Sequence, residues 1–154
     1  YANNLYVANR NGYRLDPSDL AIVVCLRHFA TVFAYSDAIW GKYGQALSNL
    51  VQFTDPRTKQ APTSNLLNSA DYGLTLPNFG NSIPSVVSRG THFAVCDMAT
   101  QFITGQLAAA MKADAQALHK EFASNLIPNS HMVTAGVVAV NRAQEHGYTL
   151  LTAL

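Results

Sequence analysis

The sequence is poor in charge. Only 12% of its 154 residues are Asp, Glu, Lys or Arg, and ten basic residues against nine acidic ones leave a net charge of +1. Globular domains usually carry about 25% charged residues. The basic residues are scattered rather than clustered, which argues against nucleic acid as a partner. Much of the surface is therefore expected to be uncharged and polar, or to be covered by other subunits.

Other features are missing as well. Two cysteines, Cys25 and Cys96, are too few for a disulfide framework, and no apolar run approaches the ~20 residues of a membrane span. The Gly-rich and Ser-centred motifs of nucleotide binding and acyl transfer do not occur, so we predict no cofactor. The five histidines show no metal-ligand spacing, so we predict no metal site within one chain. A metal site shared between subunits remains open.

What is present is an alternation of apolar runs and amphipathic segments. The pattern predicts strands at 20–26, 92–96, 131–135 and 148–153, and helices at 1–12, 36–43, 83–90, 98–112, 114–124 and 137–146. This alternation predicts a single α/β domain over residues 1–154, with helices on both faces of a mostly parallel sheet. Residues 53–82 are rich in Pro, Asn, Thr and Ser and read as an irregular insertion, either a lid or a contact with a neighbouring subunit.

The two cysteines differ in their surroundings. Cys96 ends the predicted strand in THFAVCDMATQF, where the backbone N–H groups and dipole of the next helix favour a thiolate. We therefore consider Cys96 either a nucleophile or a small buried residue at a tight turn. Asp97 disfavours a thiolate beside it, and with Thr100 and Gln101 it is expected to cap the helix. Cys25, inside LAIVVCL, is predicted to belong to the core.

Further candidates follow other predicted strands, and the carboxyl edge of a parallel sheet is where ligands bind. His28 is expected to pair with the Cys96 thiolate, to bind an anion, or to bond a loop carbonyl. Arg27 is expected to face an anion or a persulfide, or to form a salt bridge with Asp37. Gly136 marks another strand-to-helix turn whose backbone is expected to line the same pocket. The aromatic residues after the first strand form an apolar wall or, as we prefer, a subunit contact: Phe29, Phe33, Tyr35, Trp40 and Tyr43.

Several of these segments together resemble a known family. They are RGTHFAVCDMA at 89–99, Ile127-Pro128, VTAGV at 133–137, RAQEHGYTLL at 142–151 and, in the first half, NRNGY, LRH and SDAIWGKYG. The combination resembles the DsrE/DsrF-like sulfur-relay family, in its uncharacterised and often exported branch, over most of the chain except 53–82. One departure is Asp97, because members of this family often have Gly or Asn after the cysteine.

The resemblance implies a flavodoxin-like three-layer sandwich with a five-stranded sheet whose first strand lies upstream of Tyr1. That strand would lie between those of Cys25 and Cys96 and hold them about 9–10 Å apart. A disulfide requires Cα atoms within about 7 Å, so we predict that none links them.

The resemblance also implies a function. It predicts that Cys96 carries sulfane sulfur as a persulfide, within a homo-oligomer or larger assembly and with a sulfur donor or acceptor protein as partner. Arg27, His28, Asp97 and Gly136 are the predicted substrate-binding residues beside it. The alternative is a non-catalytic assembly or binding protein built on the same fold. The expected location is periplasmic or otherwise exported, with the cytoplasm as the alternative.

Overall fold

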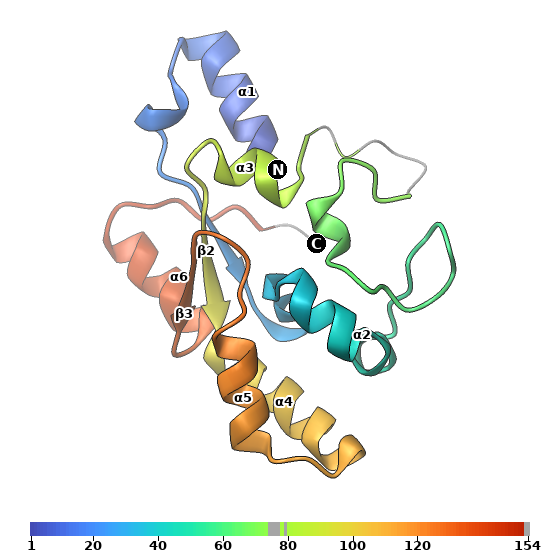
Figure 1. Cartoon of the computed structure of the whole chain (residues 1–154). Coiled ribbons are helices and arrows are strands. Elements are labelled where there is room, and N and C mark those ends of the chain that lie inside the picture. Colours follow the sequence, from blue (N-terminus) through green and yellow to red (C-terminus); the bar gives the residue numbers. More distant parts are fainter. Residues whose placement is uncertain (74–77, 79, 153–154) are drawn as a thin grey trace.

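The computed structural model describes residues 1–73, 78 and 80–152 of the chain. Figure 1 shows a small sheet at the centre with helices on both sides. The strands β1 (Val23–Leu26), β2 (His92–Cys96) and β3 (Ser130–Val133) are parallel and lie in the order β1-β2-β3. This is a mixed α/β fold with a parallel sheet, as predicted, and it is consistent with a flavodoxin-like sandwich.

The pairing of β1 with β2 corrects one expectation. The resemblance implies a strand between those of Cys25 and Cys96, but Cys25 is paired directly with Ala94, two residues before Cys96. Side chains alternate along a strand, so both thiols lie on the same face of the sheet, with Cα atoms about 8 Å apart. Both cysteines are free, as predicted, although the reason is a diagonal position on neighbouring strands rather than an intervening strand.

The first strand is also shorter and less covered than expected. The run 20–26 predicts a strand buried on both faces, whereas β1 covers only Val23–Leu26 and the Val23 side chain is 44% exposed. Cys25 is predicted to be a core residue, whereas its side chain is only half-buried. The reason is position: β1 is an edge strand, with β2 on one side only.

Different helices cover the two faces of the sheet (Figure 1). On one face, Phe93 packs against Ile83 and Val86 of α3 (Ile83–Val87), with Ala2 of α1 (Ala2–Tyr13) at the edge of this cluster. On the other face, α6 (Gly136–Glu145) contacts β1 and β2. Both cysteines point to the α6 side: Cys96 alternates with Phe93 and Val95 along β2, and the Cys25 thiol contacts Gly136 of α6.

The main core lies beyond the carboxyl ends of the strands. It joins the 3₁₀ helix η2 (His28–Ala34), α2 (Asp37–Val51), α4 (Asp97–Met111) and α5 (Ala115–Ala123). The Tyr35 and Phe122 rings meet edge to face at 4.8 Å, and the Trp40 indole N–H donates to the Val32 carbonyl. Helix α2 extends to Val51, eight residues past its predicted end at Tyr43, because Leu47 continues its buried face.

The aromatic residues after the first strand are mostly part of this core. Tyr35, Trp40 and Tyr43 are buried, and Phe33 is half-buried with its ring 5.8 Å from that of Trp40. Only Phe29 of this group is exposed. The preferred interpretation of the group as a subunit contact is therefore wrong for its buried members, whose surface is already covered within the chain.

Residues 53–82 are largely irregular, and positions 74–77 and 79 lie outside the described residues. The segment is anchored on the core through Asn65, just before the 3₁₀ helix η3 (Leu66–Asn68). The Asn65 amide N–H groups donate to the carbonyls of Phe33 and Tyr35, and its backbone N–H donates to Asp37. These bonds fix this part of the segment against η2 and α2 of the same chain.

The predicted last strand does not form. Residues 148–152 have no regular secondary structure, and Ala153 lies outside the described residues. The Tyr148 N–H bonds back to the Ala143 carbonyl at the end of α6, and Leu150 and Leu151 are exposed. An apolar run becomes a strand only where a neighbouring strand accepts its hydrogen bonds, and β3 is paired with β2 alone.

Helices long and apolar enough to cross a membrane were sought in the described part of the chain, and none was found.

Candidate functional site

Cys96 lies where the central strand turns into a helix. It is the last residue of β2 and the N-cap of the 15-residue helix α4, so the first turn of α4 begins beside its thiol. The residue is buried, with 7% of its surface exposed. Its carbonyl accepts a hydrogen bond from the Thr100 hydroxyl at 3.1 Å, and that hydroxyl accepts one from Tyr35. The backbone at the junction is therefore held by α4 and by Tyr35, the residue that follows η2.

The second thiol lies against the turn after β3. The Cys25 thiol donates to the Gly136 carbonyl across 3.5 Å. Burial raises the pKa of Cys25, the neighbouring Cys96 raises it further, and the positive charge of Arg27 acts in the opposite direction. Cys25 therefore remains protonated over a wider pH range than an ordinary thiol.

Gly136 is required by this close approach. A Cβ at position 136 would lie 2.9 Å from the Arg27 Cβ and 3.1 Å from the Cys25 sulfur, both tighter than ordinary contacts. The structure therefore brings two predicted residues, Arg27 and Gly136, together at the carboxyl edge of the sheet. The sulfur that they contact is that of Cys25, which the sequence interpretation had placed in the core.

The side chains of His28 and Arg27 lie against each other at the end of β1. His28 is exposed, with a left-handed backbone (φ 53°), and its Nδ1 lies 3.5 Å from an Arg27 guanidinium nitrogen. The alternative salt bridge between Arg27 and Asp37 does not form, because the Asp37 carboxylate accepts from Asn65 and Asn68. Arg27 and His28 thus present positive or titratable groups to solvent at the end of β1.

Asp97 has partners that sequence reasoning missed. Its two carboxylate oxygens accept from His119 on α5 at 2.7 Å and from Gln101 at 2.6 Å. The expected capping role is therefore wrong for its side chain, which is held away from the helix N–H groups. The bond from His119 fixes the Asp97 carboxylate at the start of α4, beside the junction. No spacing in the sequence indicates this pair, because it depends on how α5 packs on α4.

Two surface hollows on the described part of the chain are lined by residues other than the predicted site residues. One, of about 460 Å³, lies along α1 at Asn3, Asn4, Val7 and Ala8. The other, of about 320 Å³, lies between α2 and residues 60–63. Within the described ranges, no three His, Cys, Asp or Glu side chains converge in a way that would hold a metal ion. The candidate site is a strand–helix junction whose cysteine is buried, with 7% of its surface exposed.

Comparison with known proteins adds no relative. No family model, no curated protein and no solved structure matches the chain. The resemblance to the DsrE/DsrF-like family thus remains a prediction from the motifs, and the site is interpreted from its own geometry.

Proposed function

We propose that this chain carries sulfane sulfur as a persulfide on Cys96. The observation that supports this most is the position of the thiol at the junction of the central parallel strand with α4. Functional groups of open α/β sheets lie at this edge, and the N-terminus of a 15-residue helix stabilises negative charge on sulfur. The family resemblance of the surrounding motif points to the same residue.

The reaction is a thiol–persulfide exchange. The Cys96 thiolate attacks the outer sulfur of a donor persulfide, a new S–S bond forms on Cys96, and the S–S bond of the donor breaks. The donor leaves as a thiolate, and the transferred sulfur keeps its proton, so the product on Cys96 is a protonated persulfide. Electrons balance without an external oxidant, and the reverse exchange delivers the sulfur to an acceptor.

The residues around the junction have separate roles in this proposal. Burial of Cys96 keeps the persulfide from water and from competing thiols, so transfer requires a local opening of the junction. Arg27 and His28, exposed at the end of the neighbouring strand, attract an anionic donor. His119 holds the Asp97 carboxylate in place beside this junction through a 2.7 Å hydrogen bond. The donor or acceptor is expected to be another protein, in the exported compartment that the resemblance implies or otherwise in the cytoplasm.

Cyanide releases the outer sulfur of a persulfide as thiocyanate, which provides the test. After incubation with a small-molecule persulfide donor, we expect wild type and Cys25→Ser to release thiocyanate in proportion to protein. Cys96→Ser should release none, with an unchanged circular dichroism spectrum as the check on folding. Equal release from Cys96→Ser and wild type would overturn the proposal.

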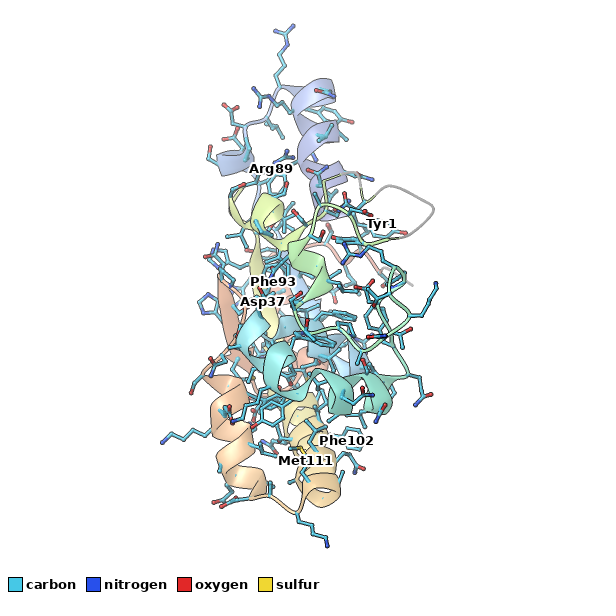
Figure 2. All side chains as sticks on the ribbon, turned by 45° about the vertical axis from the view of Figure 1, so that its right-hand side comes forward. Tyr1, Asp37, Arg89, Phe93, Phe102 and Met111 are labelled. Atoms are coloured by element: carbon cyan, nitrogen blue, oxygen red, sulfur yellow. The ribbon has the colours of Figure 1, made fainter. Side chains whose placement is uncertain are left out.

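A second candidate function, a non-catalytic assembly protein, is favoured by the exposed apolar side chains of α4. Met98 and Phe102 are 64% and 52% exposed and lie four residues apart on one side of the helix. Figure 2 shows Phe102 and Met111 at the end of the molecule formed by α4, away from Phe93 in the sheet. From Met98 to Met111 this helix carries no charged residue. Exposed apolar surface of this kind is typical of subunit contacts.

The assembly function predicts a homo-oligomer that depends on this face of α4. Light scattering should give more than one chain per particle for wild type, and a smaller particle for Phe102→Ser. Tyr13→Ser is the control, because Tyr13 is also an exposed aromatic residue but lies at the end of α1. A monodisperse wild-type monomer would rule out this candidate.

A further inference from the structure

Two histidines lie side by side on the sheet face that carries the cysteines. His92 begins β2 and His131 is the second residue of β3, and both side chains are exposed. The His92 Nδ1 and the His131 Nε2 are 3.3 Å apart, and the ring centroids are 5.5 Å apart with an angle of 24° between the planes. Two imidazoles far apart in the sequence are thus held at contact distance by the register of the sheet.

The separation of the two nitrogens matches the spacing in a metal site. Two histidine nitrogens about 2.0–2.1 Å from a tetrahedral Zn²⁺ lie about 3.3–3.4 Å from each other. We propose that His92 and His131 bind a divalent transition-metal ion, of which Zn²⁺ is the probe of choice. Neutral imidazole is a common ligand for such ions, and when the ion binds, the proton of the hydrogen bond between the rings moves to the other nitrogen of its own ring.

Two ligands leave the coordination of the ion incomplete. Within the described residues no third His, Cys, Asp or Glu joins this pair. Cys96 lies on the same face, but four residues along β2 from His92, about 13 Å away. Zinc held structurally is almost always four-coordinate, so the remaining two ligands come from outside this chain.

A second copy of this chain is the occupant that supplies them. A two-fold axis through the ion brings His92 and His131 of each copy together and closes the tetrahedron with four imidazoles. The surface around the pair suits such a contact: Val23, the register partner of His92, is exposed, and none of the three strands contains Lys, Arg, Asp or Glu. The strands therefore add no charge to this contact, and the two charged residues of α6, which lies on the same face, pair with each other: Arg142 and Glu145.

The proposal does not depend on sulfur transfer, nor on the apolar face of α4. The histidine pair lies toward the amino ends of the strands, whereas Cys96 and α4 begin at the carboxyl end. Association through α4 would persist in the presence of a chelator. Association through the histidine pair would not.

The test is sedimentation velocity of the full chain with Zn²⁺, with Mg²⁺, and with a chelator, together with calorimetric titration of Zn²⁺. We expect one Zn²⁺ per two chains, an increase in sedimentation coefficient with Zn²⁺ only, and reversal by the chelator. His92→Ala and His131→Ala should each lose both binding and association. His146→Ala is the matched control, because His146 is exposed but lies at the end of α6.

Cys25→Ser and Cys96→Ser should bind Zn²⁺ as wild type does, which separates this site from the thiols. Undiminished Zn²⁺ binding by His92→Ala and His131→Ala would overturn the site. Binding of one Zn²⁺ per chain without association would overturn the role of the second copy.

Discussion

Gly136 illustrates how a single residue sets the distance between β1 and the start of α6. An added methyl group would collide with the Arg27 Cβ and the Cys25 sulfur, at 2.9 and 3.1 Å. We expect Gly136→Ala to lower the free energy of unfolding by about 1–3 kcal/mol, the usual cost of overpacking. Urea denaturation of wild type and Gly136→Ala measures this difference in the free energy of unfolding.

Gly105→Ala is the matched control, because nothing lies within 4 Å of a Cβ added there in α4. Alanine is favoured over glycine inside a helix by about 1 kcal/mol, so this variant should be as stable as wild type or more stable. Equal stability of Gly136→Ala and Gly105→Ala would show that the turn at 136 is not tightly packed.

The titration of the Cys25 thiol tests how closely Cys96 and Arg27 lie to it. Its pKa is raised by burial and then by Cys96, and lowered by Arg27. The pH profile of its alkylation should therefore have a midpoint above the ordinary value of about 8.5. Cys96→Ser should move the midpoint down, and Arg27→Gln should move it up. Peptide mapping of the alkylated protein resolves Cys25 from Cys96, and an ordinary midpoint in all three proteins would contradict the arrangement.

Sequence reasoning located some site residues and missed the contacts between them. It placed Cys96 at a strand–helix junction correctly, since an apolar run followed by a helical pattern is a local signal. It did not find the bond of His119 to Asp97 or that of Cys25 to Gly136. These contacts depend on the packing of α5 on α4 and on the strand order, and neither is encoded in a short spacing.

At the scale of the element, helix α2 and residues 60–63 are packed so closely that one glycine is required. A Cβ at Gly44 would overlap the carbonyl oxygen of Pro62, whereas a Cβ at Gly41 would lie 3.5 Å from that of Thr63, an ordinary contact. We expect Gly44→Ala to destabilise the protein by about 1–3 kcal/mol, and to make the segment after α2 more sensitive to limited proteolysis.

Gly41→Ala should be neutral or stabilising, since it gains helix propensity without a clash. If both variants resist proteolysis equally, the segment is not held against α2 as the structure describes. The Asn65 hydrogen bonds would then be the stronger anchor to examine.

Most helices and the three strands of the sheet were predictable because each has its own periodic pattern. The exceptions have physical reasons. Residues 148–152 contain an apolar run but gain no strand partner. Helix α2 continues past the predicted residues 36–43 because Leu47 extends its buried face. Strand order was wrong because it came from a family resemblance, and β1 pairs directly with β2 in this chain.

At the scale of the whole molecule, Glu121 connects α5 to α2 and makes stability depend on pH. Its carboxylate accepts from Lys42 and from the Tyr43 hydroxyl, each at 2.7 Å, and Lys42 followed by Tyr43 lowers the pKa of Glu121. A carboxyl group whose pKa is lower in the folded state stabilises the fold above its unfolded pKa, about 4.3. That contribution is lost as the pH falls through the folded value.

Glu121→Gln should therefore lower the melting temperature at neutral pH and flatten its decline below about pH 4.3. Glu145→Gln is the control, because Glu145 pairs with Arg142 on an exposed surface where such pairs contribute little. If the melting temperatures of wild type and Glu121→Gln fall in parallel between neutral and acid pH, this linkage is contradicted.

At the level of the whole chain, only 12% of the residues are charged, so the two proposed contact surfaces are poor in charge. The exposed apolar side of α4 and the histidine pair on the sheet lie at opposite ends of the strands. Two contacts placed in this way would link copies in different directions, one with a metal ion and one without. The thiol at Cys96 lies beside the first of these surfaces, so association and sulfur transfer would influence each other.

The measurement that tests the central claim most directly is mass spectrometry of the peptide containing Cys96 after exposure of the folded protein to a persulfide donor. We predict a gain of one sulfur atom on that peptide, removed by a reducing thiol, and no gain on the Cys25 peptide. Absence of added sulfur on Cys96 at every donor concentration, or its appearance on Cys25 alone, would contradict the account.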